Sequence, residues 1–254
     1  MSKIIDNIND IETIVSKQDT LVSGTNIKTV NGESVLGSGN MLVGATIDYQ
    51  EFTTSGTWTK PVGCNYVYVE ALGGGGSGAK NTSTNIACGG AGGEFVNKIF
   101  KSSDVTSSVT ITVGSGGASQ NITGSGYDGG NSMFGTLLTA YGGGAGVTAN
   151  RCATTRRPNY GQPNNQAYLV GKPFFGIGGS HSDYGFSTVY GGGGGGGAPN
   201  AAGGASSFAG NGGKADNYGV AENGTYPSGG GGGANGAATQ SGAGANGRVR
   251  VWCW

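Results

Sequence analysis

Residues 191–197 read GGGGGGG, the longest of several glycine clusters that recur between positions 73 and 247. Glycine loses more conformational freedom on folding than any other residue, so a helix or strand interior made of seven glycines carries a large entropic cost. Two structures remain: a flexible linker, or an extended rod with three residues per turn that packs against similar rods. We expect packed rods, because the clusters recur between short apolar segments.

Rods of this kind would form an unusual core. A glycine rod carries no side chains, so neighbouring rods can approach closely on every side. Their backbone N–H and C=O groups can then bond one another, as buried backbone groups must. The loops between such rods could vary without disturbing the core. The sequence therefore predicts a glycine scaffold that displays loops.

The overall composition favours an ordered, mostly β fold. Glycine makes up 57 of 254 residues, which is about three times its usual share of roughly 7%. The 11 Tyr, 8 Phe and 3 Trp residues argue against disorder, and the absence of a Gly-X-Y period excludes collagen. Lys plus Arg equals Asp plus Glu at 14 each, so we expect no nucleic-acid partner.

Catalysis, metal binding and membrane insertion are not indicated. The single histidine, His181, argues against histidine metal clusters and histidine-dependent catalysis. The carboxylates are scattered, and there is no apolar run long enough to span a membrane. We expect no enzyme activity, cofactor or metal. The four cysteines lack a C-x-x-C spacing, so we expect small buried residues or thiols rather than a metal site or disulfide framework.

The first 22 residues form the first of three predicted regions. Their apolar residues follow a heptad spacing, which favours a coiled coil, and the wide isoleucine-rich seam favours a trimer. The alternative is a single amphipathic helix packed against its own chain. The predicted trimerisation residues are Ile4, Ile8, Ile11, Val15 and Val22.

Residues 23–46 and 47–254 form the second and third regions. In residues 23–46, β-branched residues alternate with turn signals such as Asn31-Gly32, which indicates a β-rich connector. In residues 47–254, short strands alternate with the glycine clusters. We expect a turn at 56–61 and strands at 48–52, 66–72, 94–100, 109–113, 134–141 and 248–254. The last of these strands places Val249, Val251 and Cys253 on one face, and Arg248, Arg250, Trp252 and Trp254 on the other.

Several of these segments resemble a known family. FTTSGTWTKP (52–61), VTITVGSGG (109–117), GGNSMFGTLLTAYGGG (129–144) and GRVRV (247–251) are similar to the glycine-rich domain of bacteriophage tail-fibre and receptor-binding proteins. The stretch NIKTVNGESVLGSG (26–39) resembles the connectors that follow a coiled coil in tail fibres. Residues 147–246 match this family only as glycine runs interrupted by variable loops.

The chain also resembles the tail-tip adhesins of T-even-like phages, in which glycine rods form the core and the loops between them contact the receptor. This resemblance implies a virion protein that is made in the host cytoplasm without a signal peptide. Its partners would be other tail proteins and a bacterial surface polysaccharide or outer-membrane protein. The N-terminal coiled coil departs from those adhesins, which attach to a separate fibre.

The segments between the glycine runs supply the candidate receptor-binding residues. Segment 147–175 is the longest, and its prolines favour a stiff loop. Segments 180–190 and 214–228 have a similar mixture of aromatic and polar residues, which suits glycans or protein loops. The alternative is an ordinary solvated loop. The candidates are Arg151, Arg156, Arg157, Tyr160, Asn164, Tyr168, Lys172, His181, Tyr184, Phe186, Tyr218 and Tyr226.

The sequence thus favours a receptor-binding tail-fibre protein. Two other functions stay open at this point: a tail-associated enzyme that degrades polysaccharide, and a purely structural fibre segment. The enzyme would need a pair of carboxylates at the scissile bond.

Overall fold

The computed structural model describes residues 47–82, 87–148, 184–197 and 200–254. The chain divides into two compact units, Met1–Thr46 and Ile47–Trp254. All described residues belong to the second unit, so the predicted coiled coil and connector lie outside them.

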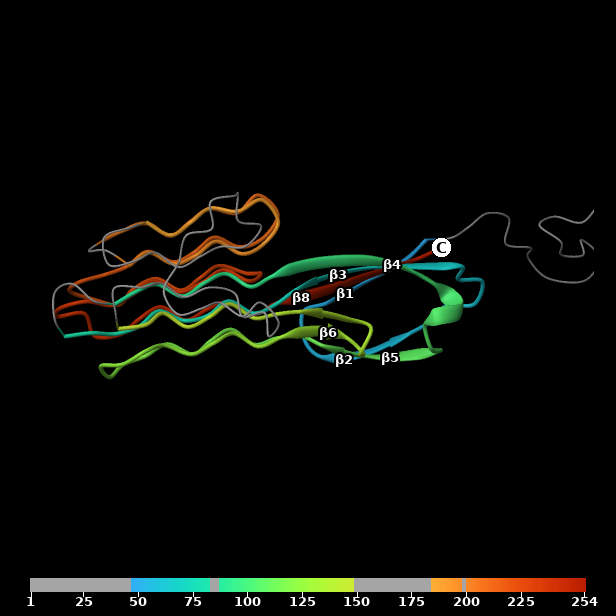
Figure 1. Ribbon diagram of the computed structural model, residues 1–254, viewed down its shortest axis with the longest axis horizontal. Helices are drawn as coiled ribbons and strands as arrows, with labels where there is room; N and C mark the ends of the chain where they lie inside the picture. Colours follow the sequence, from blue (N-terminus) through green and yellow to red (C-terminus); the bar gives the residue numbers. More distant parts are fainter. Residues whose placement is uncertain (1–46, 83–86, 149–183, 198–199) are drawn as a thin grey trace, which may run out of the picture. The chain divides into compact units, whose positions relative to one another are not determined.

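Two four-stranded antiparallel sheets form one part of this unit (Figure 1). In the first sheet the order is β1 (Asp48–Phe52), β8 (Arg248–Cys253), β3 (Tyr66–Leu72) and β4 (Phe95–Lys101). In the second sheet it is β2 (Gly56–Thr59), β5 (Ser108–Thr112), β6 (Ser132–Phe134) and β7 (Leu138–Ala140). A short 3-10 helix, η1 (Ser102–Asp104), follows β4. The prediction of a mostly β fold is confirmed.

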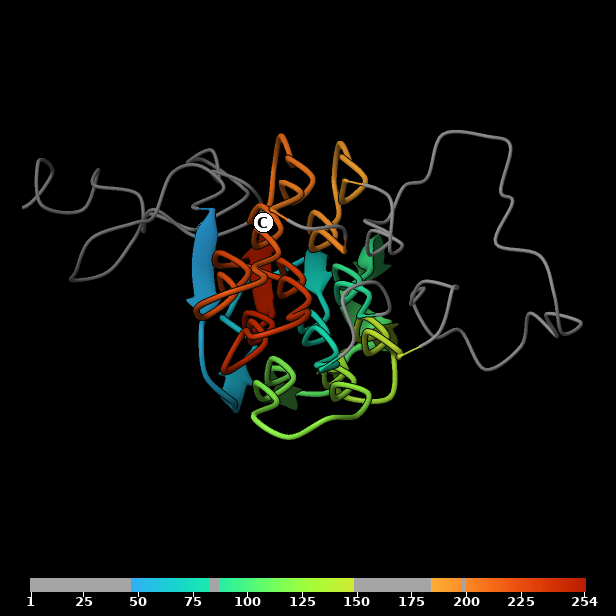
Figure 2. The same cartoon turned by 90° about the vertical axis from the view of Figure 1, so that its left-hand side faces the viewer.

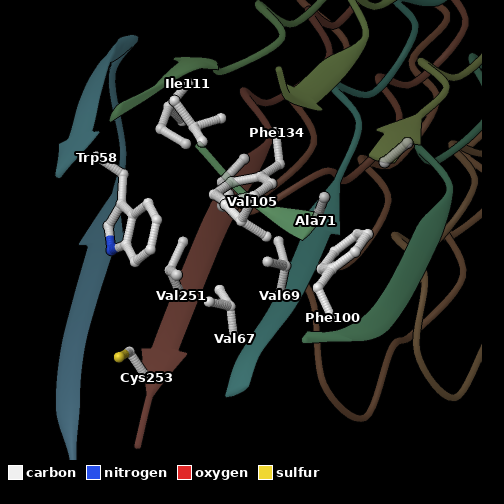
Figure 3. Close-up of a cluster of buried hydrophobic side chains, with 13 residues drawn as sticks. Trp58, Val67, Val69, Ala71, Phe100, Val105, Ile111, Phe134, Val251 and Cys253 are labelled. Carbon is white, nitrogen blue, oxygen red and sulfur yellow. The ribbon is translucent and has the colours of Figure 1, made fainter. Parts of the chain in front are cut away.

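The two sheets enclose the hydrophobic core (Figure 3). Alternate residues of β3 and β8 point inward, because side chains on a strand alternate between its two faces. From the second sheet, Trp58 and Phe134 enter the same core with ring centroids 5.6 Å apart. Phe134 also stacks against Phe100 of the first sheet at 6.1 Å. The predicted two-faced pattern of the last strand is confirmed: Val249, Val251 and Cys253 are buried.

Most strand predictions agree with the structure, and two are wrong. β1 and β3 have their predicted bounds, and β4, β5 and β8 agree to within one residue. The single strand expected at 134–141 is instead the β6–β7 hairpin, because Gly135 adopts a positive φ of 52° and reverses the chain. The turn expected at 56–61 contains β2, because Trp58 pairs with Val109 and is buried in the core.

Glycine-rich rods continue directly from the strands. β3 leads into residues 73–81, and β8 is entered from residues 239–247. Seen along their length in Figure 2, the rods appear as triangular coils, the form expected of three residues per turn. Most of their glycines are buried.

The hydrogen bonds that residues 73–80 donate repeat every three residues. Their backbone N–H groups point in turn at three different rods, within residues 87–94, 124–130 and 242–245. The first set of bonds runs from residues 73, 76 and 79 to the carbonyl oxygens of 94, 91 and 88; the second runs from 74, 77 and 80 to those of 130, 127 and 124; the third runs from 75 and 78 to those of 245 and 242. A helix with three residues per turn produces this period.

The rod 229–233 is bonded to six neighbouring rods. Its N–H groups donate to three rods, and its carbonyl oxygens accept from three others. The donated bonds reach residues 222–225, 193–196 and 76, and the accepted bonds come from residues 90, 213–216 and 242–245. The described glycine runs are therefore packed against one another and are not linkers.

Polar side chains complete the hydrogen bonding at the margins of the bundle. The side-chain oxygens of Asn131, Asp128 and Asn246 accept hydrogen bonds from the N–H groups of Gly142, Ala145 and Gly116 at 2.8–3.0 Å. Each replaces the backbone carbonyl that another rod would have supplied. Asparagine and aspartate in the glycine-rich sequence thus belong to the scaffold as well as to its loops.

The cysteine prediction is wrong for one pair. Cys64, which precedes β3, forms a disulfide with Cys253 of β8, and their Cα atoms are 5.6 Å apart. The two residues are 189 positions apart in sequence, and only the pairing of β8 with β3 brings them together. Cys88 is buried, as expected of a small apolar residue.

Candidate functional site

The rods continue from strands of the first sheet at the same end of that sheet. Leu72 of β3 is in register with both Phe95 of β4 and Arg248 of β8, and each of these residues adjoins a rod. The opposite ends of the rods therefore share one region of this unit, remote from the sheets (Figure 1). We call this region the distal end; it contains the turns at residues 120–124, 216–220 and 235–240.

Hydrogen bonds tie the distal turns together. The amine of Lys80 donates to the carbonyl oxygen of Thr239 at 2.9 Å, and its backbone exchanges two bonds with Gly124. The N–H of Thr239 in turn donates to the carbonyl oxygen of Gly219 at 2.7 Å. Three turns that are distant in sequence are thus fixed as one surface.

Two side chains stabilise this end of the bundle. Asn235 is fully buried; its amide accepts a bond from Ala87 N–H at 2.9 Å and donates to Gly197 O at 3.0 Å. The carboxylate of Asp216 accepts bonds from the N–H groups of Tyr218 and Gly219 at 2.6 and 2.8 Å. These backbone bonds hold the pKa of Asp216 below its usual value.

Most candidate receptor-binding residues lie outside the described residues, namely Arg151, Arg156, Arg157, Tyr160, Asn164, Tyr168, Lys172 and His181. The described residues on either side of this segment can be placed. Val147 accepts a bond from Cys88 near the distal end, and Thr148 follows it. Tyr184 precedes Gly185, which bonds to Ala202 in the outer part of the bundle.

The four described candidates are all exposed but do not form one cluster. Tyr218 lies in a distal turn and is 81% exposed, and Tyr184 is 70% exposed at the outer end of its rod. Phe186 lies along the side of the same rod. Tyr226 lies in a turn at the other end of the rods, near Arg248 of β8. The structure therefore places Tyr226 apart from Tyr218.

Sequence reasoning missed the outer face of the first sheet. Tyr49, Trp252 and Tyr68 lie opposite one another on three strands, and the Trp252 ring is 5.1 Å from that of Tyr49 and 5.3 Å from that of Tyr68. In the next row, Arg250 donates to Glu51 at 2.8 Å. The alternation of aromatic and charged residues in β3 and β8 is the sequence pattern that could have indicated this face.

The titratable groups of this face influence one another. Burial, followed by hydrogen bonding to Glu51, raises the pKa of Tyr49. Burial alone would raise the pKa of Glu51, but hydrogen bonds from Tyr49 and Arg250 outweigh it and lower that pKa. Burial and a bond to Glu70 raise the pKa of Tyr68. The face is therefore a coupled polar and aromatic network.

Among the residues that the structure describes, no three histidine, cysteine, aspartate or glutamate side chains gather where they could hold a metal ion. No helix in the same residues has the length and apolar character needed to cross a membrane.

Comparison with known families gives one result. A family model for a glycine-rich domain matches residues 51–254, which include the rod bundle, the second sheet and all of the first sheet except the start of β1. No curated protein matches the chain.

Proposed function

The chain belongs to the glycine-rich domain family, and from this premise we propose that it is the receptor-binding protein of a phage tail fibre. The proposal draws on the tail-fibre-like phrases at 26–39, 52–61 and 129–144. In this proposal residues 1–22 form a trimeric coiled coil, and residues 23–46 connect it to the receptor-binding unit. Other tail proteins hold the N-terminal region in the virion.

The observation that carries the proposal is the convergence of the distal turns. The turns at 120–124, 216–220 and 235–240 share one end of the bundle, and Thr148 and Tyr184 adjoin the 149–183 segment there. A scaffold whose core is backbone hydrogen bonding tolerates different loops at this end. The distal turns and the 149–183 segment together would make the receptor surface.

The chemistry of the candidate residues suits a bacterial surface glycan or an outer-membrane protein. Arginine and tyrosine supply planar groups that stack and form directional hydrogen bonds. The exposed Tyr218 and Tyr184 supply such groups among the described residues. Three copies in one fibre would bind multivalently, so weak single contacts would give tight attachment.

The test is binding of the purified full chain to a panel of bacterial cells. Replacing residues 149–183 with a Gly-Ser linker of equal length should abolish saturable binding while the melting temperature is kept. Deleting residues 1–44 should weaken binding without abolishing it, because multivalency is lost. The matched control is Val62→Ala, which changes a fully exposed residue in the turn before β3. Cell binding that survives the linker replacement would contradict the assignment of this segment.

A further inference from the structure

A groove lies where the outer face of the first sheet meets the turns at the sheet-side ends of the rods. Its volume is about 740 Å³, within the range of small-molecule sites. It is separate from the distal end, since its floor comes from β3, β4 and β8.

One wall of the groove is a stack of three aromatic rings. Phe95 and Tyr190 are stacked with centroids 5.5 Å apart, and Tyr190 and Phe208 are stacked at 5.3 Å. The rings come from β4 and from two rod turns, so residues distant in sequence build one apolar wall. Part of Tyr190 and most of Phe208 are exposed to solvent. Flat, exposed rings suit the C–H face of a sugar ring.

The floor supplies polar groups beside this wall. The hydroxyl of Tyr68 donates to the carboxylate of Glu70 at 3.0 Å, and the amide of Asn97 donates to the same hydroxyl at 3.1 Å. This arrangement fixes the orientation of a carboxylate, a phenol and an amide in a row. Such groups bind sugar hydroxyls, because they combine donors and acceptors.

Arg248 gives the groove a positive charge that the protein does not neutralise with a close partner. Arg250 is bound to Glu51 at 2.8 Å, whereas the guanidinium of the half-buried Arg248 has no hydrogen bond or ion pair with a side chain or carbonyl of the described residues. Burial and then Arg250 lower the pKa of Arg248, but a guanidinium stays charged in proteins. Its planar fork matches a carboxylate, which it binds through two parallel hydrogen bonds.

We propose that this groove binds a carboxylated saccharide of the uronic-acid class. Arg248 would hold the carboxylate, Glu70 and Asn97 the hydroxyls, and the Phe95–Tyr190–Phe208 wall the apolar face of the ring. A single negative charge suits the site, because Glu70 in the same groove would repel the second charge of a phosphate dianion. The site extends beyond the proposed function, since it is separate from the distal surface.

The experiment is saturation-transfer NMR on the full chain, with galacturonic acid and glucuronic acid as probes. We expect transfer to the ring protons of at least one of the two acids. The methyl ester of that acid should show none, because esterification removes the charge. Affinity should also fall as salt is raised. No transfer to either acid, or equal transfer to acid and ester, would overturn the proposal.

Three variants locate the site. Arg248→Met keeps the aliphatic stem but removes the charge, and should weaken binding at least about tenfold. Phe208→Ala removes the outermost ring of the wall from an exposed turn, and should weaken binding even if the first variant fails to fold. Val62→Ala, at a fully exposed residue in the turn before β3, is the control and should leave binding unchanged.

Light scattering on the same variants tests the other occupant of this face, a second copy of the chain. The proposal expects Arg248→Met to keep the molar mass of the wild type. A changed molar mass together with unchanged sugar binding would assign the groove to an interface between copies and overturn the saccharide site.

Discussion

Gly75 and Gly229 lie so close that a Cβ atom built on Gly75 would be 2.1 Å from the carbonyl oxygen of Gly229. The oxygen cannot move aside, because Gly229 is itself buried and bonded within the bundle. The same conflict recurs along the buried rods. Glycine is therefore required here by space, and not by an unusual backbone angle.

Gly75→Ala is the first prediction that follows from this packing. The added methyl group should cost about 3 kcal/mol or more, the upper part of the range for overpacked cores. Gly124→Ala is the matched control, because the nearest atom to its Cβ would be 3.9 Å away. Urea unfolding should show a large loss of unfolding free energy for Gly75→Ala and almost none for Gly124→Ala. Equal stabilities would contradict close packing of the rods.

The disulfide between Cys64 and Cys253 gives a second prediction. It closes a loop of 189 residues, and cross-links over long loops commonly stabilise a fold by roughly 2–5 kcal/mol. A digest without reductant should contain the two cysteine peptides linked together, and Cys253→Ser should unfold at lower denaturant. Reductant should lower the midpoint of the wild type but not that of the variant. Finding only unlinked peptides would refute the pairing.

The buried Asn235 carries the third prediction. Asn235→Ala would leave the N–H of Ala87 and the carbonyl of Gly197 without their partners, at about 1–3 kcal/mol for each buried group. The control is Asn217→Ala in a neighbouring distal turn, because the buried side-chain oxygen of Asn217 has no hydrogen-bond partner among the described residues. Hydrogen exchange should show faster opening of the distal turns in the first variant only.

The sequence predicted the rods and most strands because both follow from local patterns. The alternation of side chains between two faces predicted β3 and β8, and runs of glycine indicated rods of three residues per turn. β2 was missed since Thr57, Trp58 and Thr59 sit between turn signals, and only the pairing with β5 makes them a strand. The disulfide was not predicted, because the spacing of cysteines along the sequence does not indicate which strands are neighbours in the sheet.

For the candidate site, the sequence predicted the types of residue better than it predicted their positions in the fold. Tyr184 and Tyr218 are exposed, as a binding surface requires, but Tyr226 lies in a turn on the sheet side. Which turns share an end depends on the order of the rods. That order comes from long-range backbone hydrogen bonds between nearly identical glycine runs, so no local pattern encodes it.

The fourth prediction concerns pH. Glu51 has a lowered pKa in the folded protein, so its stabilising effect is present above its unfolded pKa of about 4.5 and is lost as the pH falls through the folded pKa. Glu51→Gln lacks this effect. The wild type should be more stable near neutral pH by up to about 1 kcal/mol, the range for exposed ion pairs, and the gap should close in acid. A difference in stability between wild type and Glu51→Gln that widens in acid would contradict the lowered pKa of Glu51.

The last prediction tests the distal end directly. Tyr218 is 81% exposed, and its turn is held by Asp216 and Thr239 through backbone bonds that do not involve its ring. Tyr218→Ala should therefore change the free energy of unfolding by no more than about 0.5 kcal/mol. If the distal turns form the receptor surface, the loss of this ring should reduce cell binding about tenfold or more, as for an interface anchor. Val62→Ala removes an exposed apolar side chain from the turn before β3, where no binding contact is proposed, and should bind cells like the wild type. Loss of binding in both variants would point to a general surface effect, and loss in the Val62 variant alone would contradict a receptor surface at the distal end.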